Sequence, residues 1–196
     1  MSAEVSERSF EQAIEEALLA GGPEVPAGKA SRVEQPPPQY GEYLPGGYRK
    51  RTSDDYDRVL CLIPRDVLDF VYATQPKEWE RLTQHHGAQV KDRFLKRLAS
   101  EIGQRGALDV LRSGIKDSGC KFQLYYFRPS SGLNAEIQRL YEANLFAAIR
   151  QLRYSEKDKD KSLDLGLFLN GIPIFTAELK NPLTGQTVQN AIQQYK

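Results

Sequence analysis

The stretch that most constrains the fold of this chain is SLDLGLFLNGIPIFTAELK, residues 162–180. Apolar residues lie on both sides of Asn170-Gly171, and the β-branched and aromatic types among them favour two strands over a helix. The Asn-Gly pair is a strong signal for the tight turn between two antiparallel strands. The sequence therefore predicts a β-hairpin with its turn at Asn170-Gly171.

Three charged residues lie on this hairpin. Glu178 and Lys180 are two residues apart in the second strand, so the alternation of a strand places both on one face. Asp164 lies in the first strand, in an apolar run where an acid is rare unless it is paired or bound to a metal. Two converging carboxylates suit a hard divalent cation such as Mg²⁺. With Lys180 beside them, the pattern indicates metal-assisted hydrolysis of a phosphodiester.

A plainer interpretation of the same residues is a solvated Glu-Lys pair on an edge hairpin. Charged residues make up 27% of the chain, so a spacing of Asp, a gap, and then Glu-x-Lys also arises by chance. The charge pattern by itself leaves both interpretations open.

The metal hypothesis requires a particular length of the turn, because the turn length sets which residues of the two strands face each other. A two-residue Asn170-Gly171 loop would set Asp164 opposite Ala177, on the face away from Glu178. We therefore predict a three-residue loop that begins at Leu169 and has its glycine at positive φ in a G1 bulge. Asp164 would then lie one diagonal step from Glu178, close enough for two carboxylates to share one ion.

The hairpin and the residues after it resemble a known nuclease family. LDLGLFLNGIPIFTAELKNPLTGQTVQNAIQQYK is similar to the N-terminal nuclease domain of the R (restriction and translocation) subunit of type I restriction-modification enzymes, within the PD-(D/E)xK nuclease superfamily. The similarity extends upstream through ATQPKEWERL, VLRSGIKDSGCKFQLYYFRPSSGLN and YEANLFAAIRQLRYS, and back to SERSFEQAIEEALL. It covers most of the chain outside residues 21–53, and the hairpin followed by ELKNPLTGQT is far more specific than three charged positions.

The resemblance implies an α/β fold with a restriction-endonuclease-like mixed sheet flanked by helices, and the activity of a type I site-specific deoxyribonuclease. It implies that Asp164, Glu178 and the backbone carbonyl of Leu179 bind Mg²⁺, and that Lys180 positions the attacking water. Many nucleases of the superfamily carry an acid on the first helix, and Glu11 fits that pattern as a further metal ligand. The alternative for Glu11 is favourable placement near the positive end of the helix dipole.

The resemblance also implies partners. The full R subunit would contain an ATP-driven translocase for double-stranded DNA, encoded beyond residue 196, and would assemble with modification and specificity subunits. The chain would then be an N-terminal fragment, as its end inside an expected helix also indicates. Two alternatives are a non-catalytic docking platform that keeps the nuclease fold, and a stand-alone nuclease outside restriction.

Composition narrows the class of protein further. A formal net charge of +1 excludes a strongly basic DNA-binding domain. Cys61 and Cys120 are too few for a disulfide framework, and nothing resembles a zinc-ligand spacing. The N-terminus lacks the apolar core of a signal peptide and no apolar run reaches membrane-spanning length, so we expect a cytoplasmic protein with no membrane contact.

We expect one nuclease domain over residues 1–196, in three parts after the first helix. Residues 21–53 are rich in proline and glycine and predict an extended surface excursion. Residues 54–112 predict a helical insertion, and residues 113–196 the catalytic core. The insertion holds the most concentrated basic patch, which either contacts DNA phosphates or is only a solvated face: Lys91, Arg93, Lys96 and Arg97.

Local patterns predict the remaining elements. Residues 9–20 predict the first helix, with Ser9 and Gln12 as a capping box and Gly21-Gly22 as its end. Its apolar stripe at helical spacing consists of Phe10, Ala13, Ile14, Ala17 and Leu18. CKFQLYYF predicts a strand, AEIQRLYEAN a helix, the second half of LFAAIRQLRY a strand, and Thr187 the start of a final helix.

Overall fold

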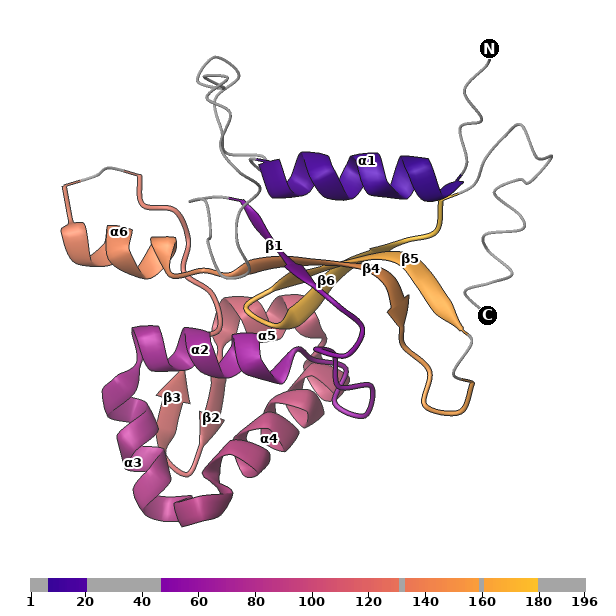
Figure 1. The fold of residues 1–196 in the computed structure, drawn as a ribbon. Coiled ribbons are helices and arrows are strands. Elements are labelled where there is room, and N and C mark those ends of the chain that lie inside the picture. Colours follow the sequence, from indigo (N-terminus) through magenta and orange to yellow (C-terminus); the bar gives the residue numbers. More distant parts are fainter. Residues whose placement is uncertain (1–6, 21–46, 131–132, 159–160, 180–196) are drawn as a thin grey trace, which may run out of the picture.

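The structure, a computed structural model, describes residues 7–20, 47–130, 133–158 and 161–179. Its centre is a four-stranded sheet in the order β1-β4-β5-β6, formed by Tyr48–Arg51, Phe146–Arg153, Ser162–Leu169 and Ile172–Ala177. β1 runs parallel to β4, whereas β4, β5 and β6 are antiparallel neighbours. Helix α1 (Glu7–Ala20) lies on one side of this sheet and helices α2 to α5 lie on the other (Figure 1). The expected α/β fold with a mixed sheet flanked by helices is confirmed.

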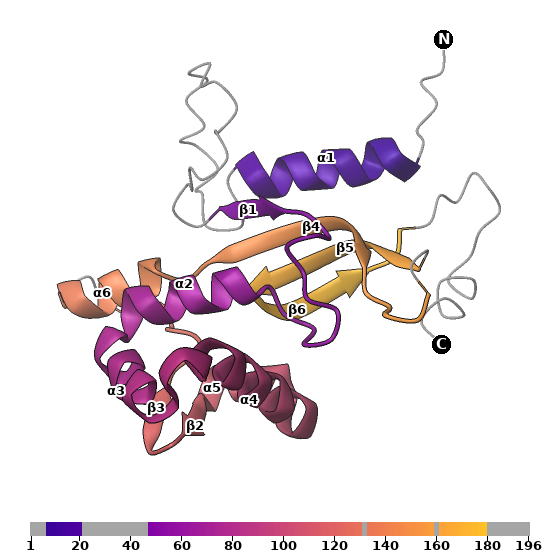
Figure 2. The same cartoon turned by 60° about the horizontal axis from the view of Figure 1, so that its bottom comes forward.

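The predicted helical insertion is also present. Proline begins α2 (Pro64–Thr74) and α3 (Pro76–His86), where its missing N–H and fixed φ suit the first helical turn. A short 3₁₀ turn, η1 (Gly87–Gln89), leads to α4 (Val90–Arg105) and then α5 (Ala107–Ser113). Figure 2 shows α3, α4 and α5 grouped on the side of the sheet away from α1. Across the described ranges, no helix combines the length and apolarity that crossing a membrane requires.

The insertion packs its apolar side chains into one core together with the turn of the β5–β6 hairpin. Phe94 and Phe122 meet at a ring separation of 4.9 Å, and Trp79 lies 5.4 Å from Phe94. Leu82 is completely buried in the same cluster, and Trp79 packs against it. Cys120 is buried and Cys61 is exposed, and both are free thiols.

The region after α5 differs from the sequence prediction. A two-stranded antiparallel hairpin, β2 (Ile115–Asp117) and β3 (Cys120–Phe122), precedes α6 (Ala135–Glu142). The predicted strand CKFQLYYF therefore ends after three residues. Beyond Phe122, side chains take the place of a partner strand as hydrogen-bond partners of the backbone. The Gln75 side chain bonds both the N–H and the C=O of Gln123, and the Asn144 side chain does the same for Tyr126. β4 extends over the whole of Phe146–Arg153, not only its predicted second half.

Strand β1 lies inside the stretch that was predicted to be a surface excursion. Its sequence, YRKR, has no apolar alternation, and it forms a strand because it pairs in parallel with β4. Arg51 at its end forms an ion pair at 2.8 Å with Asp66 of α2, whose side chain is completely buried. Residues 21–46 lie outside the described ranges, so the prediction of an excursion is wrong only for residues 48–51.

The first helix lies with an unexpected face toward the sheet. Glu11 and Glu15 are its buried residues, with 5% and 4% exposure, whereas Phe10 is 50% exposed. The helix already includes Glu7, so Ser9 lies inside it and is not its N-cap. Gln12 donates to Glu16 on the following turn, which also departs from the predicted capping box. The buried face is polar because α1 packs against β1 and β4, which carry polar partners for both glutamates.

Candidate active site

The turn of the β5–β6 hairpin is a two-residue loop. Leu169 pairs with Ile172, and both Asn170 (φ 51°) and Gly171 (φ 78°) have positive φ. The predicted three-residue loop is therefore wrong. Contacts outside the hairpin hold the shorter loop. The buried Asn170 side chain accepts from the N–H of Leu145 and donates to the C=O of Leu124, and the Gly171 carbonyl accepts from the N–H of Ile63.

A β-bulge at Ile174 then changes the register of the hairpin. Leu167 pairs with Phe175 but Phe168 pairs with Pro173, so Ile174 is the extra residue on β6. Beyond the bulge Leu165 lies opposite Ala177. The ladder ends at this pair. Continued by one residue, its register would set Asp164 opposite Glu178, and directly opposed residues on antiparallel strands share a face. The bulge therefore gives the hairpin the register that the metal hypothesis requires, in place of the predicted longer turn.

Asp164 is held by two donors. The backbone N–H of Leu179 donates to its Oδ2 at 2.6 Å, and the side-chain Nε2 of Gln151 on β4 donates to its Oδ1 at 3.2 Å. Asp164, Glu178 and Leu179 are all half-buried. Leu179 thus contacts Asp164 through its N–H, and coordination through its carbonyl stays a prediction. Lys180 and the helix predicted to begin near Thr187 lie outside the described residues.

Glu11 of α1 is linked to Asp164 through Gln151. The same Nε2 of Gln151 donates to Oε1 of Glu11 at 3.0 Å, so one amide nitrogen bonds both carboxylates. Glu15, one turn further along α1, forms an ion pair with Lys50 of β1 at 2.9 Å. Glu11 lies beyond the first turn of a helix that includes Glu7, where the effect of the helix dipole has fallen off. A role beside the Asp164 carboxylate therefore accounts for the burial of Glu11 better than the helix dipole does.

The donor set fits Mg²⁺, which prefers oxygen ligands and is commonly held by one or two carboxylates together with waters and substrate phosphates. Asp164 on β5 and Glu178, which directly follows the end of β6, would supply such carboxylates. Among the residues that the structure describes, no group of three or more histidine, cysteine, aspartate or glutamate side chains is close enough to hold a metal. The arrangement resembles an open two-carboxylate site and not a closed all-protein cage.

The predicted basic patch lies on α4, on the side of the sheet away from α1 (Figure 1). Lys91, Arg93, Lys96 and Arg97 are all exposed. Arg97 forms an ion pair with Glu101 at 2.6 Å, and Arg93 lies 3.4 Å from Nδ1 of His86. The structure therefore does not bring this patch to the carboxylates.

A serine, a histidine and an aspartate also meet at the end of α3. Oγ of Ser118 and Oδ1 of Asp117 lie 3.1 and 3.3 Å from the same ring nitrogen, Nε2 of His86. In a catalytic triad the acid and the serine contact opposite nitrogens of the ring. Here the other nitrogen faces Arg93, so the group caps α3 against the β2–β3 turn and is not a nucleophilic site.

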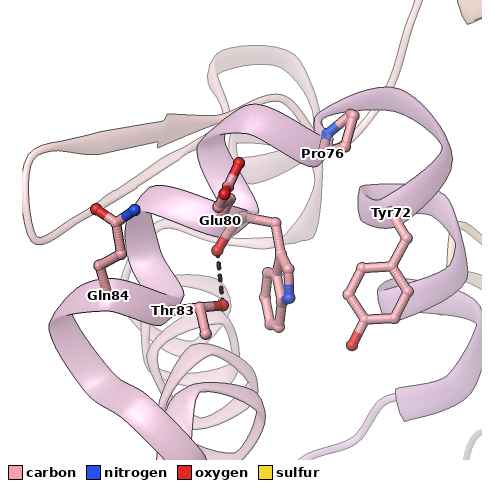
Figure 3. Close-up of a pocket in the computed structure, with 6 residues that line it drawn as sticks. Tyr72, Pro76, Glu80, Thr83 and Gln84 are labelled. Carbon is pink, nitrogen blue, oxygen red and sulfur yellow. Dashed lines mark hydrogen bonds between the residues drawn. The ribbon is translucent and has the colours of Figure 1, made fainter.

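A hollow of about 510 Å³ lies between α2 and α3 (Figure 3). Tyr72 and Trp79 form its aromatic side, at a ring separation of 5.1 Å, and burial raises the pKa of the Tyr72 phenol. Thr83 donates its hydroxyl to the carbonyl of Trp79, and Glu80 supplies the one carboxylate in the lining. This hollow lies on the helical insertion, away from Asp164, and holds no pair of acidic and basic groups suited to catalysis.

Sequence reasoning missed Gln151, which bonds Glu11 and Asp164. It also missed the pair of Glu15 and Lys50, which lies one helical turn further along α1. The one local signal for Gln151 is a polar residue between Ile149 and Leu152, two buried positions of β4. A polar residue at an exposed strand position is ordinary, so that signal could not single it out.

Comparison with known proteins identifies a family. The family model described as "Type I restriction enzyme R protein N terminus" matches residues 73–196, more than half of the chain. The matched range contains Gln151, Asp164, Glu178 and Lys180, whereas α1 and β1 precede it. Comparison with curated proteins and with solved structures found no match. On the strength of the family match, the chain belongs to the family of type I restriction enzyme R protein N-termini.

Proposed function

We propose that this chain is the DNA endonuclease domain of a type I restriction enzyme R subunit and that it hydrolyses phosphodiesters of double-stranded DNA with Mg²⁺. The observation that supports the proposal is the bulge at Ile174, because the register beyond it, continued past Leu165 and Ala177, would set Asp164 and Glu178 on one face of the hairpin. A carboxylate pair of this kind has little use in a docking platform. Family membership supports an R subunit over a stand-alone nuclease.

The residues proposed to hold Mg²⁺ are Asp164, Glu178 and the backbone carbonyl of Leu179, with Glu11 as a further candidate. Bound Mg²⁺ would stabilise charge on the phosphoryl oxygens and lower the pKa of a bound water. The chain prepares the carboxylates for this task. The donors on Oδ1 and Oδ2 fix the orientation of Asp164, and the bond from the Leu179 N–H, at 2.6 Å, is a short, charge-assisted hydrogen bond.

The strands supply the rigidity that such a site needs. β5, which carries Asp164, lies between β4 and β6 and is hydrogen-bonded on both edges. A site built on strands keeps its geometry better than one built on loops. Lys180 follows Glu178 by two residues, so continued alternation would place its ammonium on the same face, where it would orient the attacking water.

Other parts of the enzyme would deliver the DNA. An ATP-driven translocase beyond residue 196 would move double-stranded DNA to this cytoplasmic domain, and the specificity subunit would choose the site while the modification subunit completes the assembly. Cleavage would then show no strong sequence preference of its own. Lys91, Arg93, Lys96 and Arg97 would contact DNA phosphates or another domain at a surface separate from the carboxylates.

The test uses the assembled enzyme. Asp164→Ala and Lys180→Ala should each abolish Mg²⁺-dependent DNA cleavage while ATP hydrolysis and thermal stability of the assembly stay near wild type. Glu16→Ala, an exposed acid on the same helix as Glu11, is the control and should cleave normally. Cleavage that survives in either the Asp164 or the Lys180 variant would refute the proposed mechanism.

A further inference from the structure

Gln151 has an unusual backbone for a residue inside a strand. Its φ is 53°, in the left-handed region that β4 as a strand does not otherwise use. The neighbouring pairs, Arg150 with Leu165 and Leu152 with Leu163, keep the register, yet the pair between them is missing from the ladder. Left-handed conformations of residues other than glycine are strained, and they concentrate at functional sites.

The Gln151 side chain makes three hydrogen bonds around the proposed metal site. Its Nε2 donates to Oε1 of Glu11 at 3.0 Å and to Oδ1 of Asp164 at 3.2 Å. Its Oε1 accepts from the hydroxyl of Ser162 at 3.1 Å. A primary amide has two N–H donors, and both are used on carboxylates. The reverse orientation would set the amide oxygen against two carboxylate oxygens, so electrostatic repulsion selects the orientation in which Nε2 faces the acids.

We propose that Gln151 is a positioning residue of the active site, whose amide holds the Glu11 carboxylate of α1 beside the Asp164 carboxylate of β5. This inference rests on the proposed function, because it assigns Gln151 a task at that same site. Because Oε1 of Glu11 and Oδ1 of Asp164 bond the same nitrogen, the distance between these two oxygens cannot exceed the sum of the two hydrogen-bond lengths. Gln151 thereby makes α1, which precedes the family match, part of the site.

The physical need for the bridge comes from charge. Two carboxylates that face each other repel, and Glu11 is 95% buried, where water screens that repulsion poorly. Glu15 on the next turn has an ammonium partner, Lys50. Glu11 instead receives a neutral amide, which offsets repulsion without forming a lasting ion pair. A carboxylate held in this way stays available to a cation, and the outer partners of metal ligands have this role in other sites.

The test is a double-mutant cycle on the 196-residue chain, read out by calorimetric titration with Mn²⁺ as the probe. Gln151→Met should weaken Mn²⁺ binding by roughly 10- to 100-fold, the usual effect of losing an outer partner. In a Glu11→Gln background the same substitution should change the affinity much less, because the carboxylate that Gln151 positions is gone. Equal losses in both backgrounds, or no loss in either, would overturn the inference.

Two further variants separate this inference from the proposed function. Asp164→Asn should bind Mn²⁺ far more weakly than wild type, and if it binds equally well then the proposed metal site and the inference both fail. If Asp164→Asn loses binding but Gln151→Met does not, the inference alone fails. Gln104→Met is the matched control, since Gln104 is another exposed glutamine bonded to a neighbouring side chain, and it should leave the affinity unchanged.

A second readout needs no metal. In metal-free protein, the two side-chain N–H resonances of Gln151 should be distinct and shifted downfield by their carboxylate acceptors. Glu11→Gln and Asp164→Asn should each move one of the two resonances toward the position of an exposed glutamine. If both resonances already lie at that position in the wild type, the bridge does not form in solution and the inference is refuted.

Discussion

Replacing Gly171 by alanine should destabilise the protein strongly, because this residue lies in the tightly packed turn between β5 and β6. Its φ of +78° is in the left-handed region, which costs an alanine roughly 1–2 kcal/mol. The added Cβ would also meet the Ile63 carbonyl oxygen at 2.5 Å and Cγ2 and the backbone nitrogen of Val67 at 2.6 and 2.8 Å. Two of these three atoms are backbone, so relief requires moving α2, and overpacking of this kind typically costs about 1–3 kcal/mol.

The expected loss for Gly171→Ala is therefore about 2–5 kcal/mol in the free energy of unfolding, the sum of the conformational and the steric contributions. For a chain of this length, each kcal/mol lowers Tm by about 2–4 °C. Urea denaturation followed by circular dichroism measures the free energy, and a thermal scan measures Tm. Both are done on the 196-residue chain.

The matched control is Gly119→Ala. Gly119 has nearly the same backbone angle, φ +81°, but no atom lies within 4 Å of the position where its Cβ would be. It should lose only the conformational contribution, about 1–2 kcal/mol. If the two variants lose equal stability, the contacts with Ile63 and Val67 contribute nothing, and our account of how the turn is anchored is wrong.

Two other predictions concern buried groups. Asp66→Ala should cost about 3–5 kcal/mol because it leaves Arg51 with 10% exposure and no carboxylate, whereas Arg65→Ala, which breaks an exposed pair with Asp69, should cost about 0–1 kcal/mol; urea denaturation compares them. Burial raises the pKa of the Tyr56 phenol, so the folded protein keeps this proton after an unfolded tyrosine loses it, and stability should fall as pH rises above about 10. Tyr56→Phe should show a shallower fall of the urea midpoint over that range, and an equal fall would contradict the assignment.

Local signals were sufficient for several elements. The apolar runs on both sides of Asn170-Gly171 predicted β5 and β6, because pattern and turn chemistry agree there. Pro64 and Pro76 are local signals of the same kind within the predicted helical insertion, since proline is tolerated in the first turn of a helix and breaks its interior, and α2 and α3 begin at these residues.

Elements that depend on tertiary contacts could not be predicted in this way. β1 has the sequence YRKR and is a strand because β4 lies beside it and Asp66 receives Arg51. The polar face of α1 is buried because Lys50 and Gln151 lie beneath it, and no pattern within the helix contains that information. For such segments the neighbours override local propensity.

The assignment of Asp164 and Glu178 as metal ligands stays a prediction, whereas the predicted length of the turn between their strands was wrong. The contacts of the Gly171 carbonyl with Ile63, 108 positions earlier in the chain, favour the shorter loop, and the bulge then compensates. Gln151 was missed because a glutamine at an exposed strand position is common, and only the fold shows that it lies between Glu11 and Asp164.

The bulge at Ile174 also determines which kind of mutation this domain tolerates least. On β6, replacing one side chain by another of similar size leaves the parity of the positions between the turn and Glu178 unchanged. Removal or addition of a single codon in that interval reverses the parity, and Glu178 then faces the side of the sheet opposite to Asp164. Across related R subunits, the number of residues between the Asn-Gly turn and the position of Glu178 should accordingly vary much less than the identity of those residues, and where it does vary it should change by two.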